Sequence, residues 1–495
     1  MDAYQRLEDH FEELSRLGEV ISVLRWDDAV MMPPGGAEAR AEQLALLKRM
    51  HHERLVDPRV ADWLGAAADE ALDGWQQANL REMRRRRIHA ASVPAELVER
   101  FSRVSSKCES VWRTARSDDD FERVTPHLRR VVKLKRQIAA AKAEALGVEP
   151  YHALLDLFEP GMSPERIDEI FDEVARFLPE LIEEVLQNQA RQQQPKPLDG
   201  PFRVERQQKL ARRMMEELGF DFDYGRLDTS HHPFCGGVPD DVRLTTHYDE
   251  DDVLRGQMAV LHETGHALYN LGLPSQWRNQ PVGMPRSAGV HESQSLFVEM
   301  QLGRSRAFSR WSAPLYQEIL DKSGDAWSAD NLYRLKTRVR RSLIRVDADE
   351  VTYPAHVILR YRLERAMIED RLQIEELPAA WAEGMEELVG IVPDDDRDGC
   401  MQDIHWMSGL FGYFPTYTLG AMMAAQLFEA AREKFGEVDE MVEVGEFAPL
   451  IDWLGETIHS KGCRLQTDEL LEEATGSVLD PEYFRRHLKR RYLDA

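Results

Sequence analysis

Hydrophobic residues recur at three- and four-residue spacings along most of the chain, which is the pattern of amphipathic helices packed on a core. Over the first 190 residues the pattern is clearest in the segments 7–23, 39–50 and 126–146. The Pro-Pro-Gly-Gly stretch at 33–36 must separate the first helix from the second, because proline and glycine interrupt helices. We therefore expect successive helices throughout this part of the chain.

The spacing changes between residues 220 and 248, where glycine, proline and β-prone residues become frequent. Within 241–248, apolar residues alternate with polar or charged ones, which is the two-residue period of a strand. The helical spacing resumes at Asp252 and continues nearly to the end, interrupted by a loop at 273–289. The sequence thus predicts a mainly α-helical fold with a small antiparallel β-sheet beside the helix that begins near Asp252.

A polar, proline-interrupted stretch at 192–201 is the best candidate for a connection between two parts of the chain. We treat residues 1–495 as one domain, divided at about this stretch. The first subdomain is then helical and covers about 1–195, and the second covers about 196–495. No internal repeat or low-complexity tail indicates a further division.

Composition and charge narrow the possible partners. The 495 residues carry a formal net charge of −25, whereas phosphate binding needs a concentrated basic surface, so nucleic acid is not expected as a partner. The basic runs at 84–87 and 485–491 are interpreted as solvated helix faces or salt-bridge partners. No stretch approaches the roughly 18 uncharged apolar residues of a membrane span, and the N-terminus lacks the apolar core of a signal peptide. These features predict a cytoplasmic protein without a membrane partner.

The four cysteines are widely separated and form no CxxC pair, which argues against a zinc finger and a small disulfide scaffold. Free thiols fit the reducing cytoplasm. Cys235 and Cys400 lie near the motifs described below, but neither has the histidine pattern that supports a thiol nucleophile.

An HExxH motif occupies residues 262–266. On a helix, His262 and His266 are four residues apart and project from one face, so both imidazoles can reach a single metal ion. Glu263 lies beside the first ligand, where its carboxylate can act as the base on a metal-activated water. The alternative, two histidines on an exposed helix, is disfavoured by the apolar residues that this segment can bury.

A catalytic zinc needs three protein ligands and an open position for water. No third histidine follows the motif closely, so we expect a carboxylate as the third ligand. Glu292, in the sequence His-Glu-Ser at 291–293, is the first candidate, and Glu299 on the same helix face is the alternative. The spacing favours Glu292 without excluding Glu299.

Six short motifs occur in order between residues 232 and 406: HPF, DxRxT, HExxH, HES, IRxxAD and GxxQDxHW. In this order they make the chain similar to the Taq-type carboxypeptidases, a family of helical metallocarboxypeptidases. The segments 32–36 and 453–459 also resemble this family, so the resemblance covers nearly the whole chain. It implies that Glu292, rather than Glu299, is the third metal ligand.

The resemblance also implies the architecture and the assembly. It implies a helical clamshell of the gluzincin kind, in which two helical halves flank a deep groove. The N-terminal subdomain then forms a rim or lid, and the second subdomain carries the metal site. The resemblance further implies one Zn²⁺ per subunit and a homodimer, and the N/O ligand set also admits Co²⁺ or Mn²⁺.

The oxyanion that forms during peptide hydrolysis needs a donor besides the metal. We expect His405 and Tyr417 in this role, because related helical zinc peptidases use a histidine and a tyrosine about a dozen residues apart. Tyr413 is the alternative tyrosine, and either ring could instead only pack through its apolar body. Asp403 and Gln402 are interpreted as residues that orient His405 or a ligand histidine.

A carboxypeptidase must recognise a free carboxylate, and the guanidinium fork of arginine suits that task. Arg345 in IRxxAD is the first candidate for this anchor and Arg243 in DxRxT is the second. The competing interpretation is an internal salt bridge to a neighbouring aspartate, for which the sequence offers Asp347, Asp349 and Asp241. His232 in HPF is expected to border the cleft, although a turn histidine ahead of a proline is a close alternative.

Together these features predict a metal-dependent carboxypeptidase that hydrolyses the C-terminal bond of short peptides with broad specificity. The alternatives are a zinc oligopeptidase or peptidyl-dipeptidase of similar fold, and a metal-bound scaffold without activity. Glu263 argues against the scaffold, because a purely structural metal site has no use for a base at this position.

Overall fold

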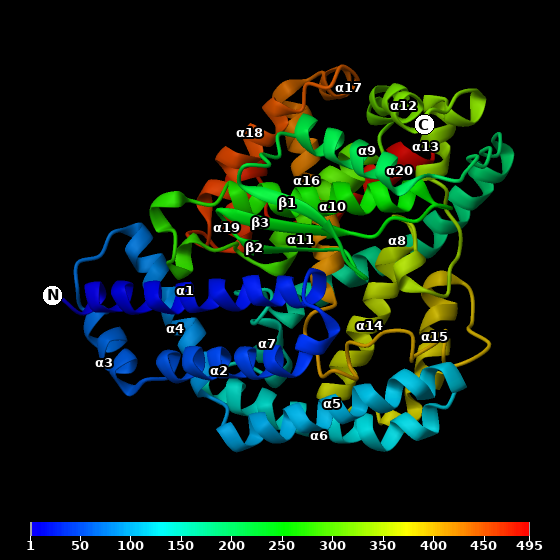
Figure 1. The fold of residues 1–495 in the computed structure, drawn as a ribbon. Coiled ribbons are helices and arrows are strands. Elements are labelled where there is room, and N and C mark those ends of the chain that lie inside the picture. The colour runs from blue at the N-terminus through cyan, green and yellow to red at the C-terminus, as the bar shows by residue number, and fades with distance from the viewer. Residues whose placement is uncertain (1, 495) are drawn as a thin grey trace.

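The computed structural model describes residues 2–494 and is mostly helical (Figure 1). Helices follow one another up to residue 191, as the hydrophobic spacing predicts. They are α1 (Ala3–Val30), α2 (Ala37–Leu55), α3 (Pro58–Ala67), α4 (Gly74–Ala91), α5 (Ala95–Asp118), α6 (Phe121–Leu146), α7 (Pro150–Leu155) and α8 (Pro164–Arg191). A 3-10 turn at Pro34–Gly36 separates α1 from α2, which confirms the expected break at the Pro-Pro-Gly-Gly stretch.

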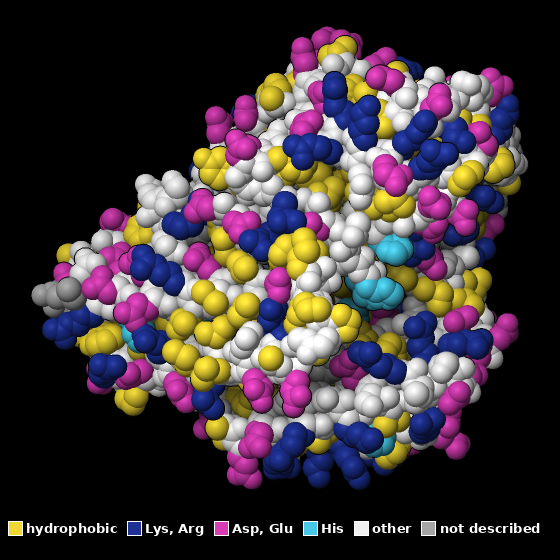
Figure 2. All heavy atoms as spheres, viewed as in Figure 1, with side chains coloured by type: hydrophobic (Ala, Val, Ile, Leu, Met, Phe, Trp, Pro, Cys, Tyr) yellow, Lys and Arg dark blue, Asp and Glu magenta, His cyan; other side chains and the backbone are white. Residues whose placement is uncertain are grey.

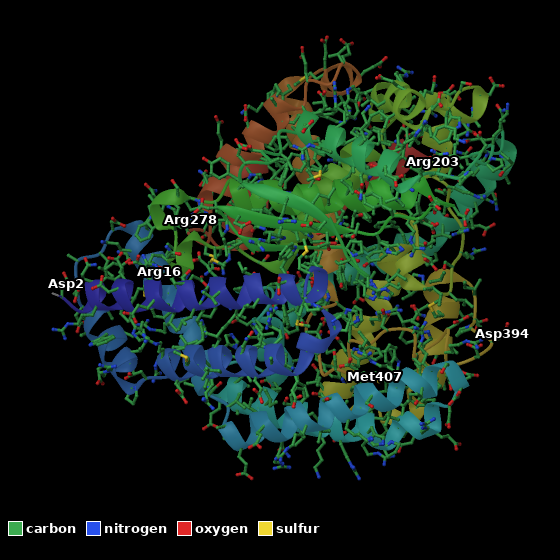
Figure 3. All side chains as sticks on the ribbon, in the orientation of Figure 1. Asp2, Arg16, Arg203, Arg278, Asp394 and Met407 are labelled. Atoms are coloured by element: carbon green, nitrogen blue, oxygen red, sulfur yellow. The ribbon has the colours of Figure 1, made fainter. Side chains whose placement is uncertain are left out.

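Local side chains fix where these helices start and stop. Asp2, labelled at the free end of α1 in Figure 3, accepts a hydrogen bond from the backbone N–H of Gln5 at 2.8 Å and so caps the first turn. Further along the chain, α6 stops at Gly147, whose φ of 71° is left-handed. Glycine adopts this conformation without the steric cost that a Cβ would bring.

A three-stranded sheet follows, made of β1 (Gly225–Thr229), β2 (Phe234–Val238) and β3 (Asp241–Thr246) in the order β1-β3-β2. β2 and β3 are antiparallel, but β1 runs parallel to β3, so the sheet is mixed and the expectation of a purely antiparallel sheet was wrong. The reason is topological. β2 and β3 form a tight hairpin, and β3 then lies between β2 and β1, which leaves β1 beside a strand of its own direction.

The sheet lies between the N-terminal helix and the helix that carries the HExxH motif. α1 packs beside β2, and α10 (Val253–Leu271) packs against β2 and β3 (Figure 1). The Ser22 hydroxyl donates to the Gly237 carbonyl at 2.7 Å, which joins α1 to the sheet. On the α10 side an apolar cluster buries Val242 and Leu244 of β3, as their alternation with polar residues predicts.

The rest of the chain is again helical. It forms α9 (Val204–Glu217) before the sheet and, after α10, α11 (Ala288–Leu296), α12 (Arg306–Leu320), α13 (Ala329–Lys336), α14 (Tyr353–Ile368), α15 (Leu377–Val389), α16 (Pro415–Phe435), α17 (Val438–Glu443), α18 (Ala448–Thr457), α19 (Thr467–Thr475) and α20 (Pro481–Tyr492). The non-helical connection between α8 and α9 contains the stretch expected at 192–201. The division into two subdomains there stays a prediction. Among the described residues, no helix combines the length and apolar character needed to cross a membrane.

α10 and α11 approach closely at Gly265, inside the HExxH motif. A Cβ built at Gly265 would lie 2.3 Å from the Gln294 carbonyl oxygen and 2.6 Å from the Ser295 Cα, both backbone atoms of α11. Glycine therefore permits the close contact between α10 and α11.

We expect Gly265→Ala to destabilise the protein by about 1–3 kcal/mol, because the added methyl group must push two helix backbones apart. The free energy of unfolding, measured by denaturant titration, checks this value. Gly455→Ala in α18 is the matched control, since nothing lies within 4 Å of its Cβ position. That substitution should be neutral or stabilise by up to about 1 kcal/mol through helix propensity. Equal effects at the two glycines would contradict the close-approach explanation.

Candidate active site

A cavity of about 810 Å³ opens beside α10 and α11. Its walls come from distant parts of the chain: the C-terminal part of α4, residues 157–160, the start of β2, the segment 285–304, the segment 345–354 and the first turns of α16. On the face drawn in Figure 2 the surface is hollowed beside a group of histidine side chains, and acidic and basic side chains are interspersed over the rest. A cavity with such mixed walls suits an extended chain that carries polar groups and varied side chains.

Three side chains at this cavity meet as a possible metal centre. The ligand atoms of His262, His266 and Glu292 all lie within 4.8 Å of one another. Glu292 Oε2 is 3.7 Å from His262 Nε2 and 3.5 Å from His266 Nε2. The two histidines share a face of α10 and Glu292 projects from α11. Gly420 of α16 lets Glu292 pack closely, since a Cβ there would lie 2.7 Å from the Glu292 side chain.

The Nδ1 atom of each histidine has a hydrogen-bond partner on the side of the ring away from Glu292. His262 Nδ1 lies 3.0 Å from Glu299 Oε2, and Arg304 donates to the other oxygen of Glu299 at 2.9 Å. His266 Nδ1 lies 3.0 Å from the carbonyl oxygen of His291. These bonds fix both rings with Nε2 directed towards Glu292. Glu299, the alternative third ligand, therefore bonds the Nδ1 side of the His262 ring, whereas Glu292 faces its Nε2 side.

The charges at this centre fit a cation. Burial alone would lower the pKa of His262, but the carboxylates of Glu292 and Glu299 reverse this and raise it to about 10. Burial would raise the pKa of Glu292, yet His262 and His266 hold it below its ordinary value. The pocket thus favours positive charge among two nitrogen donors and one carboxylate oxygen, which is the donor set of a divalent metal such as zinc.

Glu263 is free to act as a base. It lines the cavity, is only 6% exposed, and its Oε2 has no hydrogen-bond partner among residues 2–494. Burial raises its pKa above the ordinary value, although His262 and His266 oppose the shift. A buried and unpaired carboxylate of raised pKa is suited to accept a proton.

The predicted oxyanion donors lie in two layers. Tyr413 and Tyr417 both line the cavity, with ring centroids 5.3 Å apart. His405 is not among the lining residues. Its ring lies behind the tyrosines, 6.3 Å from Tyr413 and 6.4 Å from Tyr417, and packs on Phe414 at 4.4 Å. Burial lowers the pKa of His405 to about 4. Asp403 opposes this shift, and Arg345 and Arg360 add smaller contributions in the lowering direction.

The three predicted recognition residues separate in space. Arg345 lines the cavity, whereas Arg243 and His232 do not. Arg243 donates from Nε and Nη2 to Asp241 and stacks at 4.2 Å over the ring of Trp26, so it takes the internal salt bridge that the sequence left open. His232 is exposed on the loop before β2, and the cavity wall begins one residue later.

Arg345 is held by partners that the sequence did not suggest. Its Nε and Nη2 donate to Asp403, and its Nη1 donates to the Tyr353 hydroxyl at 2.9 Å. Gln402 accepts from the backbone N–H of Arg345 at 2.8 Å. The interpretation of Asp403 and Gln402 as residues that orient His405 was therefore incomplete. Both bind Arg345 directly, and Asp403 lies 3.9 Å from His405 Nδ1.

Sequence reasoning missed several cavity residues. Tyr353, Arg85, Arg286 and Arg304 all line the wall. Arg286 and Arg304 lie in segments without a recognisable chemical pattern, and Arg85 belongs to the basic run at 84–87, which was interpreted as a solvated face or a set of salt-bridge partners. The position of Tyr353 shortly after the IRxxAD motif is the one signal that could have found it.

A mostly helical fold that gathers two histidines and a glutamate beside an unpaired glutamate defines a helical metallopeptidase. The model of the carboxypeptidase Taq (M32) metallopeptidase family matches residues 6–492, and the chain belongs to this family, as the six motifs indicate. It is a metallocarboxypeptidase, a peptide hydrolase whose activity depends on a divalent metal.

Similar proteins match over almost their full lengths. The chain is 38% identical to thermostable carboxypeptidase 1 of Thermus thermophilus, over 99% of this chain and 98% of that protein. Among solved structures it resembles metallocarboxypeptidase 1 of Trypanosoma cruzi, with a TM-score of 0.97, 43% identity and 99% of both chains covered. It also resembles the M32 carboxypeptidase of Deinococcus radiodurans R1, with a TM-score of 0.93, 34% identity and the same coverage.

Proposed function

We propose that this enzyme removes C-terminal residues one at a time from short peptides, with broad specificity, and that zinc is its metal. The observation that carries the proposal is the position of Glu263, buried and unpaired beside the ligand atoms of His262, His266 and Glu292. These three residues would hold the metal. When bound, zinc supplies Lewis-acid chemistry that acidifies water and polarises a carbonyl group.

Glu263 performs the proton transfers in this proposal. Its free Oε2 accepts a proton from the attacking water, and the same carboxyl group then delivers a proton to the amine that leaves. The raised pKa of Glu263 supports both steps, because it lies closer to neutral pH than the pKa of an exposed glutamate does.

Tyr417 is our proposed donor to the oxyanion, with Tyr413 as the alternative. Both tyrosines line the cavity, and burial raises the pKa of Tyr413 to about 12 and that of Tyr417 higher still, so both keep their hydroxyl protons at neutral pH. His405 stands behind the two rings. It is therefore a weaker candidate for direct donation than either tyrosine.

Arg345 is our proposed anchor for the C-terminal carboxylate of the substrate. It lies on the wall of the cavity with an 8% exposed side chain, and Tyr353 beside it supplies a further hydroxyl group. An anchor close to the metal site limits the released product to one residue. A more distant anchor would release dipeptides, as expected for a peptidyl-dipeptidase.

An unmodified peptide of about ten residues tests the proposal directly. We expect a time course followed by mass spectrometry to show a ladder of single-residue losses from the C-terminus. A chelator should abolish the ladder and added zinc should restore it, because the histidine and glutamate side chains bind the metal reversibly. Dipeptide losses or internal cuts would instead support a peptidyl-dipeptidase or an oligopeptidase, and would exclude Arg345 as an anchor next to the scissile bond.

We further propose a cytoplasmic homodimer with one metal per subunit, in which Co²⁺ or Mn²⁺ can replace Zn²⁺. The free thiols of all four cysteines support a reducing compartment. The family resemblance supports the dimer. Light scattering tests it, since a dimer has twice the chain mass of 57.0 kDa.

A further inference from the structure

Behind Arg345 lies a second arginine that does not reach the cavity. Arg360, on α14, has a fully buried side chain and donates from Nε to Asp403 Oδ2 at 2.6 Å. Its Nη1 donates to the His356 carbonyl at 2.8 Å and its Nη2 donates to Gln402 Oε1 at 2.7 Å. The guanidinium also lies 4.5 Å from the ring centroid of Trp381.

Asp403 is thus shared between two arginines. Its Oδ1 takes the Nη2 of Arg345 at 2.9 Å while its Oδ2 takes the Nε of Arg360. Among residues 2–494, no other carboxylate bonds to either guanidinium group. Two guanidinium groups and one carboxylate leave one positive charge in a nearly water-free place.

The neighbouring histidines do not change this balance. Burial and the two arginines lower the pKa of His356 to about 3, and burial lowers that of His405 to about 4, so both rings are neutral at neutral pH. Burial lowers the pKa of Arg360 only to about 10, which keeps this guanidinium charged. Only Arg345 carries the resulting positive charge to the cavity wall.

We propose that Arg360 is a positioning residue that makes Arg345 selective for a free C-terminal carboxylate. With Arg360 present, the single negative charge of Asp403 is shared between two arginines. One positive charge is then left over, and Arg345 presents it to the substrate. Without Arg360, Asp403 would balance Arg345, and the wall would offer a neutral ion pair to a carboxylate. The inference rests on the proposed role of Arg345 as anchor, and it assigns the selectivity of that anchor to a residue that never touches substrate.

Binding measurements test the proposal in the zinc-loaded protein carrying Glu263→Gln, in which turnover is expected to be too slow to interfere. The probes are an N-acetylated dipeptide and its C-terminal amide, measured by calorimetry. We expect the acid to bind at least about 30-fold more tightly than the amide. The acid forms a desolvated charge pair with Arg345, and the neutral amide cannot form it. Arg360→Gln should reduce this preference to within about 3-fold of unity.

The double variant Arg360→Gln with Asp403→Asn distinguishes charge from packing. It again leaves one positive charge on Arg345, so the preference for the acid should return to within about 3-fold of the starting value. In enzyme with Glu263 intact, Arg360→Gln should raise KM for the free acid and leave kcat within a few-fold, since the lost interaction is one of substrate binding. A packing role would instead weaken acid and amide equally, without recovery in the double variant, and would overturn the proposal.

Two further variants decide the question if Arg360→Gln does not fold. Arg360→Lys keeps the charge and should keep the preference for the acid. Asp403→Asn alone increases the positive charge and should keep or increase the preference. Its collapse to unity would show that Asp403 acts by orienting Arg345, and would refute the charge explanation. If the starting protein shows no preference, the proposed anchor role of Arg345 fails, whatever Arg360 does.

Discussion

Replacing Glu263 with glutamine should lower kcat by about 10³-fold, which is the usual scale for losing a positioned general base. The amide cannot accept the proton that the carboxylate takes, while its size and its place on α10 are unchanged. Metal content should stay the same, because Glu263 is not one of the three side chains whose ligand atoms converge. Steady-state hydrolysis of a short peptide and metal analysis after dialysis measure the two quantities.

Glu318→Gln is the matched control, since Glu318 is exposed on α12 and away from the cavity. It should leave both kcat and metal content unchanged. Full activity in Glu263→Gln would remove the proposed mechanism. Loss of metal together with activity would instead assign Glu263 a structural part in the metal site.

Replacing Glu292 with glutamine should weaken zinc binding by at least about 100-fold, because even the outer partners of metal ligands contribute 10- to 100-fold. The change removes the one negative charge that faces both Nε2 atoms, and two neutral imidazoles are left to hold the ion. Competition with a chromogenic chelator measures the affinity without reference to turnover.

Glu299→Gln is the informative comparison. Glu299 bonds the rear nitrogen of His262, so its loss should cost about 10- to 100-fold through a poorly oriented ring. We expect the smaller effect at Glu299 and the larger at Glu292. The reverse order would reassign the third ligand to Glu299, the alternative that sequence spacing left open.

The predictions that depended on local spacing agree with the fold. The helical periodicity of the first 190 residues and the break at 33–36 are confirmed because both are properties of consecutive residues. The structure brings His262 and His266 together for the same reason, since a spacing of four residues is close to one helical turn of about 3.6 residues. The prediction of an antiparallel sheet was wrong for the β1–β3 pair, because neighbouring strands in a sheet need not be neighbours in sequence.

The roles of the arginines could not be decided from their motifs. Arg243 and Arg345 both sit near aspartates in sequence, and the structure pairs Arg243 with the near one. Arg345 pairs with Asp403, 58 residues away, and this aspartate is already shared with Arg360. No spacing rule predicts such a triad, because its members come from different segments that meet only when α14 packs beside the loop before α16.

The helical class of this protein, its family and the pair of histidines set for one metal ion could all be predicted from the order of its residues. Each of these predictions depends on hydrophobic periodicity or on an ordered set of short motifs. Such local patterns do not depend on contacts between residues far apart in the sequence. Residue spacing left two points open that the packing of the helices resolves. Glu292 faces both histidines whereas Glu299 bonds the Nδ1 of His262, and Arg345 rather than Arg243 reaches the cavity. Those outcomes depend on how separate helices pack, because a side chain acquires its charge environment from whichever distant backbone is pressed against it.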